Sequence, residues 1–226
     1  MEATAAKEWG LLADAWDLMA ASFRFPDEDL AQRVASGAWL DEAFDLVRSL
    51  DLHPQDGFGL GLYTSADVEA ASYGMVCDIA TGICSCVDPA PDAETVLAAL
   101  EVEAKRLFVG DSRPLCEPRE GAWRGDECAK SVEAFAEACD FVPEACSQGE
   151  AADHVSAECS LLAELARRAD VEPIAQEEQA AADYRRFFEE HAACWMPVFA
   201  RSVDECSKEA FYRSAAQFLE ALLAAR

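Results

Sequence analysis

The residues of this chain best suited to chemistry by type and spacing are Asp153, His154 and Glu158. His154 and Glu158 are four residues apart, so their side chains can touch on a helix surface. A surface histidine beside two carboxylates has its charged form favoured, and it could act as a hydrogen-bond donor, a pH-sensitive contact or a general base. The alternative is structural, with Asp153 capping the helix and His154 bonding a loop carbonyl.

A second group of polar side chains follows Gly110 in a stretch that cannot be helical throughout. Gly110 is placed to end a helix in a left-handed cap, and Pro114 and Pro118 each restrict the residue before them. Loops on a rigid scaffold often carry binding groups, although a simple connector is the alternative. The stretch carries five side chains that could meet a partner: Arg113, Glu117, Arg119, Glu120 and Trp123. We expect Glu120 to be exposed and able to face a basic ligand.

Three aromatic residues could line a groove for an apolar segment, namely Phe108, Trp123 and Trp195, and ordinary core packing is the alternative, which we favour for Trp195. Glu103 lies on or beside an apolar helix face, where an unpaired carboxylate would be costly. We therefore expect Glu103 to pair with an arginine or to cap a neighbouring helix.

The ten cysteines contain no Cys-x-x-Cys, and their closest cluster is Cys77-x6-Cys84-x-Cys86. That spacing does not match common zinc or ferredoxin sites, so we interpret the cysteines as structural thiols. The alternative is a metal or iron–sulfur module built on these three residues.

Catalytic motifs are missing from the sequence. It contains no Gly-x-Ser-x-Gly, no phosphate-binding loop and no His-Glu-x-x-His, and its three histidines are scattered. We expect neither enzymatic activity nor a cofactor or metal, and we rank nucleotide hydrolysis at the Asp153–His154 surface last.

Hydrophobic periodicity predicts an all-α fold of about eight helices in a single domain spanning residues 1–226. The predicted helices cover residues 5–24, 27–35, 39–50, 93–109, 126–141, a segment from residue 153, and 208–225. Glycines interrupt residues 55–92, where 66–76 could be helical and the stretch with Cys84 and Cys86 reads as loop or short strand.

The composition limits the possible partners. Hydrophobic residues make up 52% of the 226 residues, as in globular proteins, and the net charge is −26. So acidic a chain disfavours duplex nucleic acid and anionic membrane surfaces and would attract a basic partner. With no apolar run long enough to span a membrane and no secretory signal pattern, we expect a cytoplasmic protein without membrane insertion.

Three stretches resemble the signatures of TorD-like chaperones, which assist the maturation of molybdenum-containing redox enzymes. Glu103-Ala-Lys-Arg-Leu-Phe-Val-Gly110 with Pro118-Arg-Glu120 is similar to E-Y-x-R-L-F-V-G-P-G…P-Y-E-S, and Asp153-His154 with Glu158 to P-D-H-x-x-x-E. Phe187, His191, Trp195, Pro197 and Phe199, then Phe211-Tyr212, follow the family's F-x-x-x-H-x-x-x-W-x-P-x-F…F-Y. The chain departs from the signatures at Ala104, Asp111, Arg119 and Ala152.

The resemblance implies a chaperone that binds the apo form of a molybdopterin-containing oxidoreductase and its twin-arginine signal peptide before cofactor insertion. It also implies a monomer or a helix-swapped dimer. The residues expected to contact the partner are Asp153, His154, Glu158, Arg113, Glu120, Trp123 and Phe108.

Overall fold

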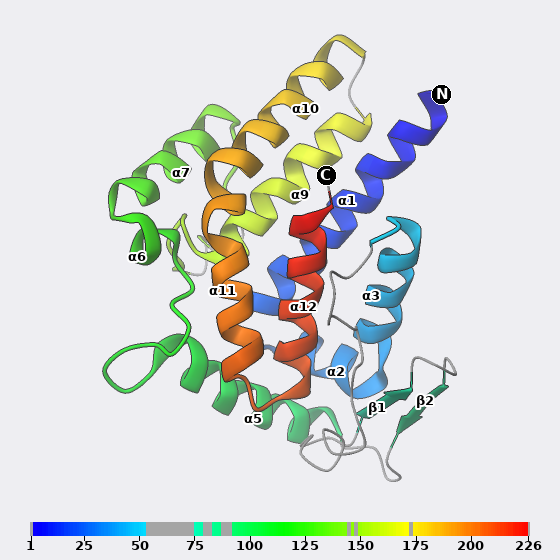
Figure 1. Cartoon of the computed structure of the whole chain (residues 1–226), viewed down its shortest axis with the longest axis vertical. Coiled ribbons are helices and arrows are strands. Elements are labelled where there is room, and N and C mark those ends of the chain that lie inside the picture. The colour runs from blue at the N-terminus through cyan, green and yellow to red at the C-terminus, as the bar shows by residue number, and fades with distance from the viewer. Residues whose placement is uncertain are drawn as a thin grey trace. The chain divides into compact units, whose positions relative to one another are not determined.

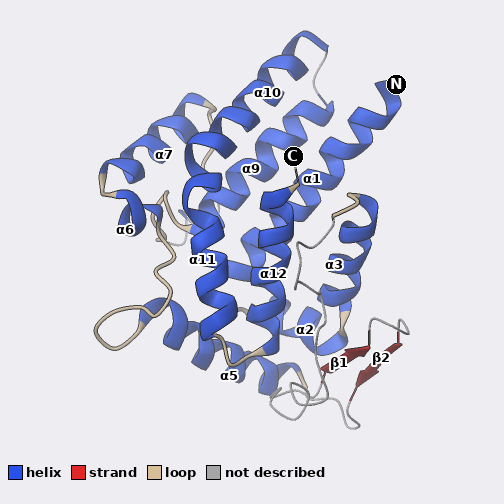
Figure 2. Cartoon of the chain, in the orientation of Figure 1, coloured by secondary structure: helices blue, strands red, loops and turns tan. Residues whose placement is uncertain are grey.

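A computed structural model describes residues 2–52, 75–78, 83–86, 92–143, 146, 149–171 and 174–225. These residues are mostly helical, which confirms the predicted all-α fold class (Figure 2). The chain forms two compact units. Unit 1 comprises Met1–Arg24, Ser49–Asp51 and Pro118–Pro197, and unit 2 comprises Phe25–Arg48, Leu52–Glu117 and Val198–Arg226. The single-domain organisation stays a prediction.

Unit 1 is built around three long helices, α1 (Glu2–Phe23), α9 (Val155–Val171) and α10 (Ile174–Phe187). Helix α9 packs against both α1 and α10 (Figure 1). The indole Nε1 of Trp16 on α1 donates a 2.9 Å hydrogen bond to the hydroxyl of Tyr184 on α10. This buried bond joins two aromatic residues that lie 168 positions apart in the sequence.

Of the other elements of unit 1, two precede α9 in the sequence and two follow α10. They are α6 (Glu120–Arg124), α7 (Glu127–Ala138), the π-helical turn η2 (Phe188–Ala192) and the first residues of α11 (Ala193–Cys206). Helix α10 runs directly into η2, which runs into α11. Functional side chains of this unit come from α6, η2 and the start of α9.

Unit 2 contains α2 (Glu28–Ser36), most of α3 (Ala38–Ser49), α5 (Ala93–Ala104), the π-helical turn η1 (Lys105–Val109), the rest of α11 and α12 (Ala210–Ala224). Helices α2 and α5 pack together. Each begins at an aspartate whose carboxylate accepts a backbone N–H three residues on, Asp27 from Leu30 and Asp92 from Thr95.

An antiparallel hairpin also belongs to unit 2, with strands β1 (Met75–Asp78) and β2 (Ile83–Cys86). Its register pairs Cys77 with Cys84 and Met75 with Cys86. The sequence allowed a short strand here, but it assigned Met75 and Val76 to a possible helix over 66–76, and the rest of that range lies outside the described residues. The side chains of Cys77, Cys84 and Cys86 also lie outside them, so the metal alternative is untested.

The helix that begins at residue 93 ends at Gly110, as predicted, but not in a left-handed cap. Gly110 has φ 64° and ψ 168°, a positive-φ conformation with extended ψ. A Cβ atom here would lie 2.1 Å from the carbonyl oxygen of Arg113, so only glycine fits. The ranges predicted from the sequence do not include α10, α11 or the short helix α6, which lies within the stretch assigned as irregular. Among the described residues, no helix combines the length and apolar character needed to cross a membrane.

Candidate partner-binding site

In unit 1 the backbone at Pro118–Gly121 is hydrogen-bonded to the start of α9. The N–H of Val155 donates to the carbonyl of Pro118 at 2.8 Å, and the N–H of Glu120 donates to the carbonyl of Asp153 at 2.9 Å. These bonds flank an isolated antiparallel bridge between Arg119 and His154. Two of the family-like stretches, some 30 residues apart in sequence, therefore form one local structure.

Asp153 stabilises the neighbouring helix α6. Its Oδ2 accepts the N–H of Gly121 at 2.9 Å, in the first turn of α6, and a Cβ on Gly121 would lie 2.9 Å from that same oxygen. The prediction that Asp153 caps its own helix is wrong, because α9 begins at Val155 and the capping position is His154. The imidazole Nδ1 of His154 accepts the N–H of Ser156 at 3.2 Å, which is the capping bond of α9.

His154 is buried, with 6% of its surface exposed, so the prediction of a surface histidine is wrong. Its Nδ1 is also 2.8 Å from the hydroxyl of Ser156, which can donate to it. Burial, and then the positive charge of Arg119, lower the pKa of His154 to about 4. Glu150 lies 3.7 Å from Nε2, but its carboxylate is 38% exposed and solvent-screened, so burial dominates. The expectation that the charged form is favoured is therefore also wrong.

Glu158 is fully buried, and its side chain does not pair with His154, contrary to the prediction. Its Oε2 accepts a 3.1 Å hydrogen bond from the indole Nε1 of Trp195, and Oε1 has no partner among the described residues. Burial, and then the negative charge of Glu120, raise the pKa of Glu158 well above its usual range. The protonated form of Glu158 is therefore favoured inside unit 1, and Trp195 is a core residue with 1% exposure, as we favoured.

Glu120, expected to be exposed, is completely buried. Its Oε1 accepts a hydrogen bond from the guanidinium of Arg124, and Nδ1 of His191 donates to Oε2 at 2.8 Å. Arg124 also donates to the carbonyl of Glu190 at 2.7 Å. The prediction failed because His191, which holds Glu120 inside the unit, is 71 residues away in the sequence.

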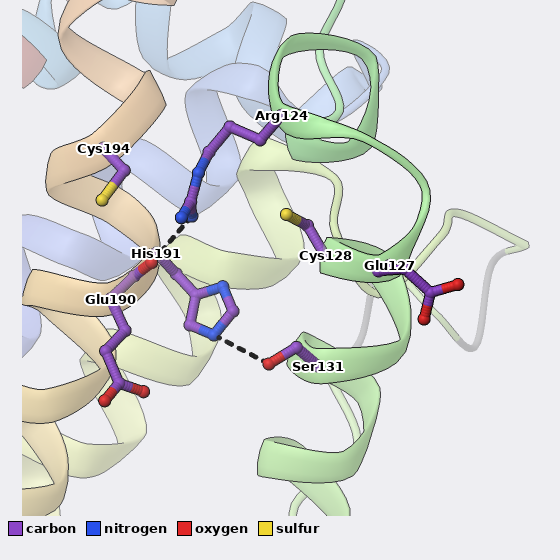
Figure 3. A pocket seen from close by; sticks show the side chains of 7 residues that line it. All are labelled: Arg124, Glu127, Cys128, Ser131, Glu190, His191 and Cys194. Atoms are coloured by element: carbon purple, nitrogen blue, oxygen red, sulfur yellow. Dashed lines mark hydrogen bonds between the residues drawn. The ribbon is translucent and has the colours of Figure 1, made fainter.

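An open cavity of about 390 Å³ lies beside this buried group, between α6, α7 and the η2–α11 segment (Figure 3). It is lined by Arg124, Glu127, Cys128, Ser131, Glu190, His191 and Cys194. Nδ1 of His191 bonds the buried Glu120, and its Nε2 lies 3.4 Å from the hydroxyl of Ser131.

The cavity's thiols and carboxylates do not form a metal site. The sulfur atoms of Cys128 and Cys194 lie on either side of the Arg124 guanidinium (Figure 3). Burial, and then the charge of Glu120, raise the pKa of Cys128, which favours its protonated form. Within the part of the chain that the structure describes, no three His, Cys, Asp or Glu side chains are grouped to hold a metal ion.

The predicted site residues therefore fall into two sets. Unit 1 brings together Glu120, Asp153, His154 and Glu158 as buried groups, with Trp123 39% exposed on α6. Unit 2 contains Arg113, which is exposed, and Phe108, which is half-buried with its ring 5.4 Å from Tyr212 and 6.1 Å from Phe199.

Two residues of the site were missed in the sequence. Arg124 follows Glu120 by four positions, a spacing that could have identified the ion pair once α6 was assigned. His191 stands in the family-like pattern, but no local spacing in the sequence connects it with Glu120.

The family model described as nitrate reductase delta subunit matches residues 72–201, more than half of the chain. No curated protein and no solved structure gives a significant match. The match confirms the resemblance to redox-enzyme chaperones and agrees with the prediction that the chain is not an enzyme. This chain belongs to the nitrate reductase delta subunit family, whose members are chaperones for the maturation of molybdenum enzymes.

Proposed function

We propose that this chain is a cytoplasmic chaperone that binds the N-terminal twin-arginine signal peptide of an apo molybdenum oxidoreductase and holds the enzyme until its cofactor is inserted. The observation that carries the proposal is membership of the delta subunit family. Binding of the leader, the cytoplasmic setting and the choice between a monomer and a helix-swapped dimer are parts of the proposal.

The charge of the chain supports a leader peptide as the ligand. Such peptides join a basic region to an apolar region. A net charge of −26 attracts the basic region over a distance and raises the association rate at low salt. Helix α7 contributes three exposed carboxylates to this charge, those of Glu127, Glu133 and Glu137.

The apolar region of the leader needs exposed apolar side chains. In unit 1, Trp123 is 39% exposed and Val142 is 73% exposed. Trp123 lies on α6, the helix that Glu120 and Asp153 hold in place through hydrogen bonds to His191 and to the N–H of Gly121. We therefore assign positioning roles to Glu120, Asp153, His154 and Glu158, and direct contact with the leader to Trp123. Phe108 and Arg113 are proposed contacts supplied by unit 2.

Calorimetric titration of the full chain with synthetic twin-arginine leaders tests the proposal. We expect binding that weakens as salt rises, because charge contributes to it. Trp123→Ala should weaken binding about tenfold, as expected for an aromatic anchor. Val142→Ala is the matched control, since it removes another exposed apolar side chain of unit 1 and should leave the affinity within about twofold.

Two results would contradict parts of the proposal. Absence of binding to every leader tested, with the protein folded, would remove leader recognition and leave a chaperone acting on the mature part of its client. Equal losses in Trp123→Ala and Val142→Ala would remove the specific role of Trp123.

A further inference from the structure

Unit 2 holds two cysteines, 90 positions apart, at neighbouring points of the π-helical turn η1. Cys116 donates its backbone N–H to the carbonyl of Leu107 at 2.8 Å. The carbonyl of Cys206, at the end of α11, accepts a 2.7 Å hydrogen bond from the guanidinium of Arg106. Because Arg106 and Leu107 are consecutive residues, the backbones of both cysteines are fixed beside the same turn.

The two thiols also contact each other. The side chains of Cys116 and Cys206 share a hydrogen bond, and both cysteines are free. Their environments differ, since Cys116 is completely buried and Cys206 is exposed. Burial, and then the adjacent Cys206, raise the pKa of Cys116 to about 12, so the buried thiol stays protonated at neutral pH. An oxidant in solvent therefore reaches Cys206 first.

We propose that Cys116 and Cys206 are an oxidisable thiol pair, in which a hydroperoxide modifies exposed Cys206 and buried Cys116 then closes a disulfide. The proposal is independent of leader binding.

Each step of this reaction balances. The Cys206 thiolate attacks one peroxide oxygen, so an S–O bond forms, the O–O bond breaks and the other oxygen leaves as an alcohol after taking up a proton. The Cys116 sulfur then attacks the sulfenic sulfur of Cys206 and gives up its proton. An S–S bond forms, the S–O bond breaks, and water leaves. Overall the thiol pair loses two electrons and two protons, and the hydroperoxide is reduced to an alcohol and water.

Peptide mapping of the full chain after treatment with hydrogen peroxide tests the assignment. Free thiols are alkylated before digestion, with and without prior reduction by dithiothreitol. We expect a Cys116–Cys206 linked peptide that accumulates with peroxide and disappears on reduction. In Cys116→Ala the linked peptide should be absent, and Cys206 should be trapped as the sulfenic acid by dimedone. In Cys206→Ser, Cys116 should remain a free thiol because oxidant does not reach it.

The matched control is Cys194→Ser, which removes an exposed thiol of unit 1 and should leave the yield of the linked peptide unchanged. Far-UV circular dichroism establishes that each variant is folded. The proposal is overturned if Cys206 of the folded wild-type chain links to a different cysteine, stays a trappable sulfenic acid, or is not oxidised while Cys194 is.

Discussion

Each unit contains a glutamate buried on a helix, and the pKa values of the two are displaced in opposite directions. Glu103 in unit 2 accepts two hydrogen bonds from Arg106, at 2.7 and 2.6 Å, and one from the N–H of Lys208 at 2.6 Å. The Ser207 hydroxyl donates a fourth at 3.2 Å. Burial opposes ionisation of Glu103, but these donors outweigh it and lower its pKa. Glu158 in unit 1 has a single donor, Trp195, and burial raises its pKa.

Burial alone therefore does not decide the charge of a carboxylate in this protein. The charge of a buried carboxylate also depends on how many hydrogen-bond donors it has and on their charge, because each donor offsets part of the lost hydration. Unit 2 uses an ionised carboxylate to join α5 to the residues that follow α11. Unit 1 instead favours the neutral forms of His154 and Glu158, near an ion pair in which Glu120 is buried and the Arg124 side chain is 34% exposed.

Glu103→Ala should give the largest loss of stability. The substitution leaves the Arg106 guanidinium, the Lys208 N–H and the Ser207 hydroxyl without their shared acceptor. Removing one partner of a buried ion pair costs about 3–5 kcal/mol. Urea unfolding monitored by circular dichroism measures the change.

Glu101→Ala is the matched control on the same helix. Its carboxylate, 37% exposed, pairs with exposed Lys105 at 3.1 Å. Such surface pairs contribute about 0–1 kcal/mol. Losses of equal size in the two variants would show that donors to Glu103 do not stabilise unit 2.

His154→Asn tests whether unit 1 excludes charge at the start of α9. The folded-state pKa of His154 is about 4, below its ordinary value of 6.5, so its contribution to stability is present above pH 6.5 and is lost as pH falls toward 4. The free energy of unfolding of the wild type minus that of the variant should fall by about 3 kcal/mol over this range. Asparagine can still accept the N–H of Ser156. A pH-independent difference would mean that His154 is not held neutral.

Glu158→Gln tests the neutral carboxylic acid directly. The pKa of Glu158 is raised in the folded state. Its contribution to folding stability is therefore fully present below its ordinary pKa of 4.5 and is lost as pH rises toward the folded-state pKa. The glutamine variant should therefore gain stability over the wild type between pH 5 and 8, by at most about 1.4 kcal/mol per pH unit. Denaturant unfolding at several pH values measures this slope. A slope of the opposite sign would mean that Glu158 is ionised like Glu103.

Glu150→Gln should have the smallest effect. Its exposed carboxylate lies 3.7 Å from Nε2 of His154, and solvent screens their interaction. The unfolding free energy should change by less than about 0.5 kcal/mol at pH 7, and the NMR titration midpoint of His154 should stay in place. A clear downward displacement of that midpoint would show that Glu150 favours the charged form of His154 and offsets part of the effect of burial.

The sequence predicted the environment of Glu103 correctly because its main partner is local. Arg106 is three residues away on the same helical run, and the need to pair a carboxylate on an apolar face follows from general physics. The helices α1, α2, α3 and α12 were likewise predictable, since their periodicity and breakers lie within each segment.

The environment of Glu120 could not be predicted in the same way. The prolines of its stretch correctly indicated irregular backbone, but irregular backbone does not imply exposure. Glu120 is buried because its N–H donates to the carbonyl of Asp153 beside the start of α9, and because His191 comes from a segment 71 residues away. Only its pairing with residues far away in the sequence distinguishes Glu120 from an exposed glutamate, and no local sequence pattern predicts that pairing.

The π-helical turn η2 has a consequence for insertions and deletions. A π-turn holds one residue more than the α-helical turn it replaces. Deleting one residue within Phe188–Ala192 would let α10 continue as a regular helix into α11 and rotate every later side chain by about 100° relative to α10. His191 would then leave Glu120, whereas the hydrophobic content of the segment would hardly change. In alignments of this family, a one-residue gap at η2 would therefore mark chains that have lost the buried His–Glu pair.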